Sequence, residues 1–358
     1  MRLLIITNDY PPKPGGIQTY LGNLVDAYPH EVRVLAPADG PAAGTQRGEQ
    51  VVRRGERRFM WPTRKVVDWL VLEAREFEAE AILFGAPHPL SRATPRLRKQ
   101  LGIPVGILCH GAEVTIPAAI PGIRSWLRRI LRSADALFAV SRYTQRKVAR
   151  LTGRDVVAIG AGVDVETFTP AATPPDNVPP VIGCVSRFVP RKGQHRLMAA
   201  AAELRTQGVE VELLMVGKGR MEKKLRRLAS SSEVPVRFEI DVPWSRLADL
   251  YREMDIFCMP CRTRWAGLEI EGLGLVFLEA AATGLPVLAG SSGGSPETVI
   301  PAETGFVVDS VDDIVEGLEL LLGDRKGAAA MGAKGRARVV EEYVWDRVVA
   351  NLLGGFRS

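Results

Sequence analysis

Short apolar runs typical of β-strands alternate with amphipathic segments along almost the whole chain. The first run spans residues 2–7; a Pro- and Gly-rich loop follows, and apolar residues then recur at helical spacing from Ile17 to Val25. Further runs of this kind are Glu31 to Ala36, Ala81 to Phe84, Val105 to Cys109, Ala136 to Val140 and Val156 to Ile159. This alternation predicts an α/β fold in which helices cover both faces of a parallel sheet.

The clearest break in composition is the segment 170–180, which holds five prolines in eleven residues. Such a segment cannot form a regular element, so we expect an extended linker. The pattern restarts after it, with strands expected at Val181 to Val185, Val211 to Val216, Ile256 to Met259, Pro286 to Ala289 and Gly305 to Val308, and a helix at Gln194 to Arg205. We therefore expect a first domain at 1–169, a second at 181–340, and a C-terminal helix at 341–358 that can cap either domain, with packing back onto the first as one option.

The charge balance indicates an anionic partner. The chain has 47 basic and 41 acidic residues and a net charge of +6, which fits a nucleotide, an anionic lipid or a nucleic acid. No nucleic-acid motif accompanies the charge, so nucleic acid is not an expected partner. No apolar segment is long enough for a signal peptide or a spanning helix, which predicts a cytoplasmic protein. The C-x-x-C pair of Cys258 and Cys261 has no second pair and is expected to be structural.

Two loops at predicted strand ends suit an anion. The segment 186–193 follows the first strand of the second domain and carries Arg187, Arg191 and Lys192. Ligands of open α/β sheets bind beyond the carboxyl ends of the strands, and three cations there suit a pyrophosphate. A solvated basic loop would have the same composition. In the first domain, Gly16 precedes a helix and permits close approach of an anion, although a plain tight turn is the alternative.

The most informative stretch contains Glu271 and Glu279, which are separated by seven residues. Glu271 lies in a Gly-rich loop, and Glu279 lies within a helix predicted to begin near Leu275. A carboxylate can accept two hydroxyls of a sugar or ribose. The loop and helix start offer backbone amides to a phosphate or a sugar hydroxyl; these are the amides of Leu273, Gly274, Leu275 and Val276.

This combination resembles the retaining glycosyltransferases of family four, whose signature is two glutamates with seven residues between them. The resemblance covers nearly the whole chain and includes the motifs at 110–113, 162–164, 217–219 and 293–297. It implies the GT-B architecture, two Rossmann-like domains whose parallel sheets face one another across a cleft. Within the family, segments 8–18 and 259–264 look most like the actinobacterial transferases that add α-1,6-linked mannose from GDP-mannose to phosphatidylinositol monomannoside.

The resemblance implies a role for each matching residue. Arg187 and Lys192 would hold the donor diphosphate, with help from the Gly16 amide. Glu279 would bind the ribose hydroxyls, and Glu271 would bind the donor sugar together with the amides of residues 273–276. His110 would lie near the transferred sugar, so the implied catalytic group is His110, Arg187, Lys192 and Glu271. The family needs neither metal nor another cofactor, and no Asp-x-Asp motif occurs.

Two basic segments of the first domain point to an anionic acceptor or lipid. The segment 122–132 predicts an amphipathic helix, with Ile123, Trp126, Leu127, Ile130 and Leu131 flanked by Arg124, Arg128, Arg129 and Arg132. This pattern suits an anionic membrane surface, and equally a helix buried on one side with solvated arginines. The second cluster surrounds residues 59–62 and comprises Arg53, Arg54, Arg57, Arg58, Arg64 and Lys65. In the lipid-acceptor relatives that the chain resembles, this region meets the head group, so the resemblance implies acceptor contacts at Gln18, Trp61, Arg64 and Lys65.

The sequence thus predicts a retaining mannosyltransferase that acts on a phosphatidylinositol monomannoside-type glycolipid, peripherally at the inner face of the cell membrane. A family-four transferase with another nucleotide-sugar donor and a non-lipid glycan or small-molecule acceptor is the alternative. Asp241 stands where relatives often carry a Gly pair near the base, which leaves that alternative open. A related binding protein without turnover is disfavoured, because Arg187, Lys192, Glu271 and His110 are all present.

Overall fold

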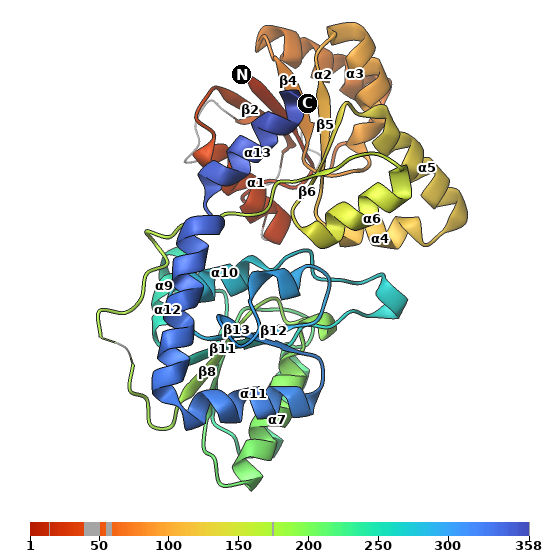
Figure 1. Ribbon diagram of the computed structural model, residues 1–358. Helices are drawn as coiled ribbons and strands as arrows, with labels where there is room; N and C mark the ends of the chain where they lie inside the picture. Colours follow the sequence, from red (N-terminus) through yellow and green to blue (C-terminus); the bar gives the residue numbers. More distant parts are fainter. Residues whose placement is uncertain (14, 39–50, 55–58, 174, 358) are drawn as a thin grey trace. The chain divides into compact units, whose positions relative to one another are not determined.

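The apolar runs of the sequence become the buried strands of two parallel sheets, each in its own unit (Figure 1). Unit 1 consists of Met1–Gly162 and Trp345–Ser358, and unit 2 of Val163–Val344. The computed structural model describes residues 1–13, 15–38, 51–54, 59–173 and 175–357. Parallel strands are covered on both faces, which explains why their sequences are continuously apolar rather than alternating.

In the described part of unit 1, seven strands pair in parallel in the order β3-β2-β1-β4-β5-β6-β7. The strands are β1 (Leu3–Ile6), β2 (Val32–Pro37), β3 (Val51–Arg54), β4 (Ala81–Phe84), β5 (Val105–Cys109), β6 (Ala136–Ala139) and β7 (Val157–Ala158). The helices are α1 (Gly16–Ala27), α2 (Arg64–Glu76), α3 (Thr94–Leu101), α4 (Ala112–Ala118), α5 (Pro121–Ser133), α6 (Arg142–Thr152) and α13 (Trp345–Arg357).

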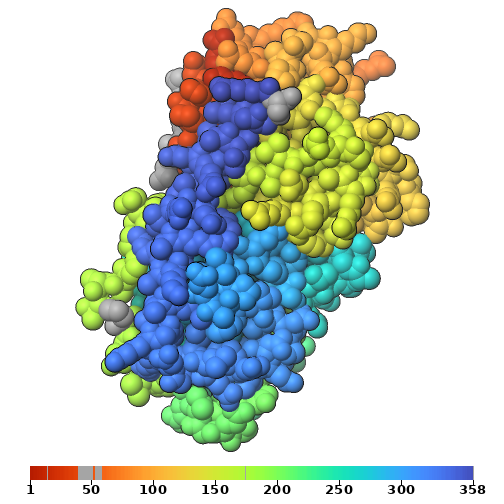
Figure 2. Space-filling model, in the orientation of Figure 1, coloured from red at the N-terminus to blue at the C-terminus, as the bar shows by residue number. Residues whose placement is uncertain are grey.

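The C-terminal helix α13 belongs to unit 1, although the chain reaches it from unit 2. It packs beside α1 and against β6 (Figure 1). The space-filling view shows the dark blue residues of this helix against the red N-terminal segment (Figure 2). Phe356 packs against Phe138 of β6, with tilted rings whose centroids are 5.1 Å apart, which anchors the last turn.

Across the described residues of unit 2, six strands pair in parallel in the order β10-β9-β8-β11-β12-β13. The strands are β8 (Val181–Val185), β9 (Glu212–Val216), β10 (Val236–Glu239), β11 (Ile256–Met259), β12 (Val287–Gly290) and β13 (Gly305–Val308). The helices are α7 (Gln194–Thr206), α8 (Glu222–Ser232), α9 (Trp244–Arg252), α10 (Leu275–Ala282), α11 (Val311–Gly323) and α12 (Arg325–Glu342). The first strand of each unit lies inside its sheet, as in doubly wound folds.

The sequence missed two strands, β3 and β10, each of which lies at one edge of its sheet; the strands at the opposite edges, β7 and β13, were expected. β10 contains Arg237 and Glu239 and is only half-buried along its length. β3 ends in Arg53 and Arg54. An edge strand has one paired side and tolerates charge, so it lacks the continuous apolar run that reveals an inner strand.

The chain passes from unit 1 to unit 2 after Gly162, and the segment from there to the Pro-rich stretch is packed within unit 2. Phe168 is buried and meets the Tyr251 ring edge-to-face at 5.6 Å. Arg252 donates to the carbonyls of Thr167 and Thr169 at 2.9 and 3.0 Å. Within 170–180 no helix or strand forms among the described residues.

Candidate active site

A basic turn follows β8 in unit 2. It carries Arg187, Arg191 and Lys192. The side-chain amide of Gln194, at the start of α7, donates to the Arg187 carbonyl at 3.0 Å and ties the turn to the helix. The Arg187 side chain is exposed, whereas Lys192 is 7% exposed. The three expected cations therefore occupy different environments, and two of them point into the protein.

Gly193 lets this turn lie against the segment that follows β11. Its φ is 80°, and a Cβ atom there would stand 2.1 Å from the Pro260 carbonyl oxygen. The Arg262 amide donates to the Arg191 carbonyl at 2.9 Å across the same contact. Only glycine fits this conformation and this spacing. The contact brings Arg191 and Lys192 to the loop that carries Glu271.

The carboxylate of Glu271 lies between these two cations. The Lys192 ammonium is 2.8 Å from Glu271 Oε2, and the Arg191 guanidinium pairs with the same oxygen. Burial raises the pKa of Glu271, but the charges and hydrogen bonds of Lys192 and Arg191 outweigh it and hold the pKa at about 2. Glu271 is therefore ionised at neutral pH and supplies the negative charge that balances the buried cations.

The backbone at Glu271 is held by the turn after β12. The Ser292 hydroxyl accepts from the Glu271 amide at 3.1 Å, and the Gly294 amide donates to the Glu271 carbonyl at 3.0 Å. Gly293 has a φ of 60°, and a Cβ atom there would stand 1.9 Å from the Glu271 carbonyl oxygen. The glycines at 293–294 thus contact the backbone of Glu271 and fix its position.

Helix α10 begins at Leu275, as the sequence predicts. Gly274 precedes it with a φ of 92°, and a Cβ atom there would meet the Phe277 ring at 2.6 Å. The first amides of a helix have no partner within the helix, so those of Leu275 and Val276 are available to an anion or a hydroxyl. Leu273 is buried, while residues 274–276 are half-buried.

Glu279 lies on α10, 5% exposed. The Tyr251 hydroxyl donates to Glu279 Oε2 at 2.8 Å. Burial raises the pKa of Glu279 to about 7, although the Tyr251 hydrogen bond and the charge of Lys192 act in the opposite direction. The charge of Lys192 lowers the pKa of both glutamates, so Lys192, Glu271 and Glu279 form one group in unit 2. In this group Glu271 is ionised, whereas the pKa of Glu279 lies close to neutral pH.

His110 follows β5 in unit 1, where the sequence predicts a strand end. Its Nε2 lies 2.9 Å from the Gly85 carbonyl oxygen, and His110 is 8% exposed. Burial lowers the pKa of His110, opposed by the nearby Glu113 carboxylate. A carbonyl only accepts, so Nε2 carries the proton and Nδ1 is the acceptor of the neutral ring. The Glu113 carboxylate also accepts from the Gly111 amide at 2.9 Å, which fixes the turn.

The glycine loop of unit 1 is tied to the segment that carries Trp61. The Asn8 side chain donates to the Met60 carbonyl at 3.1 Å and accepts from the Met60 amide at 2.7 Å. The Gln18 amide donates to Asp9 Oδ1 at 2.8 Å. Gly16 is exposed at the start of α1. These contacts bring Gln18 and Trp61 to one region of unit 1.

The other expected acceptor residues lie nearby in sequence. Arg64 and Lys65 are exposed on the first turn of α2, which Thr63 caps. Trp61 is 59% exposed and lies 5.2 Å from the Phe59 ring, centroid to centroid. Within the same cluster, Arg57, Arg58 and the side chains of Arg53 and Arg54 lie outside the described residues.

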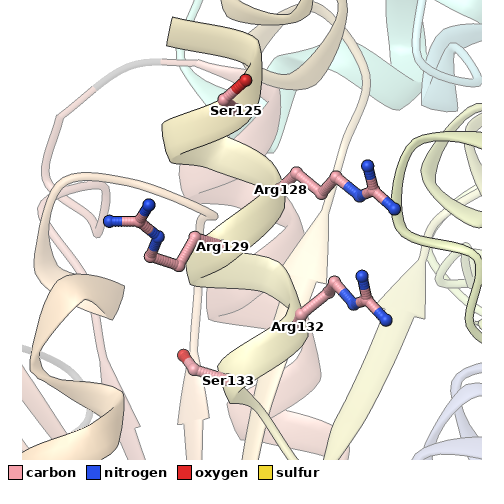
Figure 3. Close-up of a pocket in the computed structure, with 5 residues that line it drawn as sticks. All are labelled: Ser125, Arg128, Arg129, Arg132 and Ser133. Atoms are coloured by element: carbon pink, nitrogen blue, oxygen red, sulfur yellow. The ribbon is translucent and has the colours of Figure 1, made fainter. Parts of the chain in front are cut away.

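Helix α5 divides the residues of the basic amphipathic segment between the core and the surface. Leu127, Ile130 and Leu131 are buried in the core of unit 1, so most of the apolar face is unavailable to lipid. Its arginines remain exposed. An open pocket of about 420 Å³ is lined by Ser125, Arg128, Arg129, Arg132 and Ser133. Arg128 and Arg132 extend to one side of the helix and Arg129 to the other (Figure 3).

Comparison with known proteins identifies the family. The model described as Glycosyltransferase Family 4 matches residues 14–167, and the model described as Glycosyl transferases group 1 matches residues 165–338. The GDP-mannose-dependent monoacylated alpha-(1-6)-phosphatidylinositol monomannoside mannosyltransferase of Corynebacterium glutamicum is 39% identical, over 96% of this chain and 95% of that protein. The chain belongs to the group 1 glycosyltransferases. This confirms the resemblance drawn from the two glutamates.

Another relative of this glycosyltransferase is the GDP-mannose-dependent alpha-(1-6)-phosphatidylinositol monomannoside mannosyltransferase of Mycobacterium tuberculosis, 39% identical over 100% of this chain and 98% of that protein. Solved structures confirm the GT-B fold. Sucrose-phosphate synthase from Thermosynechococcus elongatus has a TM-score of 0.82 at 20% identity, covering 99% of this chain and 98% of that one. Anabaena HepE in complex with UDP has a TM-score of 0.82 at 19% identity and covers 99% of both chains.

Two residues of the glycosyltransferase site were not singled out from the sequence. Arg191 was noted only as one cation of a basic turn, yet it pairs with Glu271. Its place beside Lys192 was the available signal. Tyr251, the partner of Glu279, carries no such signal, because an apolar helix face contains buried tyrosines for many reasons.

No group of three or more His, Cys, Asp or Glu side chains within the described ranges could hold a metal ion. The four cysteines are buried free thiols, in agreement with a structural role for Cys258 and Cys261. Among the helices that the structure describes, none combines the length and apolar character that crossing a bilayer requires.

Proposed function

We propose that this glycosyltransferase moves mannose from GDP-mannose to a phosphatidylinositol monomannoside-type glycolipid, with an α-1,6 linkage and retention at the anomeric carbon. Two relatives that carry such names are 39% identical over nearly the whole chain. The observation in the structure that supports a donor diphosphate best is the cluster in which Lys192 and Arg191, from the turn after β8, pair with Glu271, from the loop after β11. Such a cluster offers fixed positive charge to an anion in a site of low dielectric.

The donor-binding roles are as follows. Arg187 and Lys192 neutralise the diphosphate, and the Gly16 amide assists. Glu279 accepts the ribose hydroxyls. Glu271 and the amides of Leu273, Gly274, Leu275 and Val276 hold the sugar. Two features support this assignment: Arg187 is exposed and able to meet a ligand, and Lys192 already lies beside a carboxylate oxygen at 2.8 Å.

The reaction needs charge stabilisation more than a strong base. The bond between the anomeric carbon and the diphosphate oxygen breaks, and the acceptor hydroxyl attacks from the same face. Its proton passes to the leaving phosphate. Arg187 and Lys192 stabilise the negative charge that grows on the diphosphate. His110, neutral and with Nδ1 as acceptor, takes a hydrogen bond from a hydroxyl of the transferred sugar and orients it.

A donor panel tests the proposal. Purified enzyme is given phosphatidylinositol monomannoside together with one donor at a time: GDP-mannose, GDP-glucose, UDP-glucose or UDP-galactose. The masses of the products are measured by mass spectrometry. We expect one added hexose with GDP-mannose only. Transfer from a UDP-sugar with GDP-mannose ignored would contradict the donor, and transfer to a water-soluble glycan in preference to the lipid would contradict the acceptor.

We also propose that unit 1 contacts anionic lipid through α5 and that the protein acts peripherally at the inner face of the cell membrane. The exposed Arg128, Arg129 and Arg132 around one pocket support this role, as do the exposed Ile120 and Ile123 at the start of the helix. Flotation with phosphatidylinositol vesicles tests it. Replacing the three arginines with glutamine should abolish flotation, and equal binding to neutral vesicles would contradict it.

A further inference from the structure

Within unit 1, the rings of Trp345, Tyr20 and His110 form a chain of contacts. The Tyr20 ring, on α1, meets the His110 ring edge-to-face with centroids 5.4 Å apart at 85°. Tyr20 also meets the Trp345 ring, with centroids 5.2 Å apart at 70°. Trp345 is the first residue of α13. The rings therefore connect a strand end, the first helix and the last helix of the unit.

Tyr20 is fixed by burial and by a hydrogen bond. It is 3% exposed, and its hydroxyl donates to the Gly160 carbonyl at 2.8 Å. Burial raises the pKa of Tyr20, so the hydroxyl keeps its proton and this hydrogen bond. His110 is fixed at one ring nitrogen by the Gly85 carbonyl. A hydrogen bond through one nitrogen leaves the imidazole free to tilt about it, and the Tyr20 ring limits that tilt.

Trp345 lies where the chain crosses between the units. A Cβ atom at Gly162 would stand 2.7 Å from the Trp345 backbone nitrogen and 2.6 Å from its ring. In unit 2, the Val163 amide donates to the Tyr343 carbonyl at 2.9 Å. The two crossings thus run side by side. Gly162 allows them to do so, because any side chain there would displace the indole.

We infer that Tyr20 and Trp345 are positioning residues for His110, and that they make the orientation of its imidazole depend on the chain conformation at the two crossings. This inference rests on the proposed role of His110 at the transferred sugar. A change in backbone angles at residues 344–345 moves the indole first, then the Tyr20 ring, then the imidazole. Misplacement of a catalytic group by about 1 Å lowers a rate by roughly a hundredfold, so a smaller tilt is sufficient to matter.

The experiment compares Trp345→Leu with Trp345→Phe and a matched control. Phe356→Leu is the control, because Phe356 anchors the other end of α13 on Phe138, away from Tyr20. Two readouts are taken on the full chain: kcat and KM with GDP-mannose and acceptor, and the NMR titration of the His110 ring. The chain has only four histidines, so His110→Gln assigns the resonance.

We expect Trp345→Leu to lower kcat about tenfold with little change in the donor KM, because the ring tilts without leaving the site. The His110 resonance should move, and its pKa should rise toward the ordinary value as water reaches the ring. Trp345→Phe should restore most of both. Phe356→Leu should lower the unfolding temperature while leaving kcat and the His110 titration unchanged.

The inference is overturned if Trp345→Leu leaves the His110 resonance at its wild-type position, or if Phe356→Leu moves the resonance and kcat equally. The proposed role of His110, on which the inference rests, fails differently. If His110→Gln retains full kcat while Trp345→Leu still shifts the His110 resonance, then the rings position an imidazole that does not serve the transfer.

Discussion

At the scale of single residues, the donor-side cluster is a balance of buried charge. Lys192 and Arg191 share one oxygen of Glu271, and the three side chains are between 9% and 13% exposed. Taking charges out of water is unfavourable unless they are paired. Glu271 therefore keeps the two cations in place before a donor binds. A bound diphosphate can then supply part of the negative charge that pairs with them.

We expect Lys192→Ala to weaken binding of GDP by about tenfold to a hundredfold. A hydrogen bond to a charged group contributes about 1.5–3 kcal/mol, and each 1.4 kcal/mol is about tenfold in affinity. Isothermal titration calorimetry measures the change. The control is Lys223→Ala, since Lys223 is exposed on α8. Unchanged affinity for GDP in the first variant would remove the diphosphate role from Lys192.

Replacing Glu271 with glutamine should lower the free energy of unfolding by about 3 kcal/mol at pH 7, because two buried cations lose their counter-charge. The pKa of about 2 lies below the ordinary 4.5, so the stabilisation is present above 4.5 and is lost as pH falls toward 2. Urea denaturation of the variant and the wild type at pH 7 and pH 3 measures the loss of stability at pH 7 and its decrease at low pH. A variant as stable as the wild type at pH 7 would show that the pair contributes nothing.

Glu279 should show the opposite dependence on pH. Its pKa of about 7 lies above the ordinary 4.5, so its contribution to stability is intact below 4.5 and is lost as pH rises from 4.5 through 7. Glu279→Gln should therefore unfold at nearly the wild-type free energy at pH 5 and be more stable by about 3 kcal/mol well above pH 7. Chemical denaturation across this range measures the difference. A constant difference would mean that the Glu279 carboxyl does not titrate in this window.

At the scale of elements, glycines at strand and helix ends hold the site together. Gly193 packs the basic turn against Pro260, Gly293 packs against the Glu271 carbonyl, and Gly274 precedes the first residue of α10. Each has a positive φ, and two of them leave no room for a Cβ atom beside backbone. The loops beyond the strand ends of unit 2 are thus positioned by backbone contacts, and the side chains follow.

Gly293→Ala should destabilise the protein by about 1–3 kcal/mol and raise the donor KM, because the new Cβ must displace the Glu271 carbonyl. Gly323→Ala is the control, since nothing lies within 4 Å of a Cβ atom there. Thermal unfolding and steady-state kinetics separate the two effects. Equal behaviour of the two variants would show that the 293 turn does not determine where Glu271 lies.

At the scale of the whole molecule, the net charge of +6 is distributed unevenly. Arg124, Arg128, Arg129 and Arg132 are all exposed on α5 of unit 1. Charge on a surface attracts an anionic bilayer over about a Debye length, which shrinks from about 10 Å at 0.1 M salt to about 3 Å at 1 M.

Binding to phosphatidylinositol vesicles should therefore fall at least tenfold between 50 mM and 500 mM salt. Transfer to an acceptor dissolved in detergent should change far less over the same range. Sedimentation with vesicles and the detergent assay give the two values. Vesicle binding that is insensitive to salt would point instead to apolar insertion by residues such as Ile120 and Ile123.

The sequence alone was sufficient for the class of the fold, every described strand except β3 and β10, the start of α10 and the family. Buried parallel strands are continuous apolar runs, and two glutamates around a glycine loop are a local pattern. Only the tertiary structure decided the rest. It buried most of the apolar face of α5, placed β3 and β10 at edges, and paired Arg191 with Glu271 and Tyr251 with Glu279. It also set Tyr20 against His110 and Trp345 against Tyr20. These outcomes depend on which faces meet, and residues far apart in the chain carry no local sign of their contact.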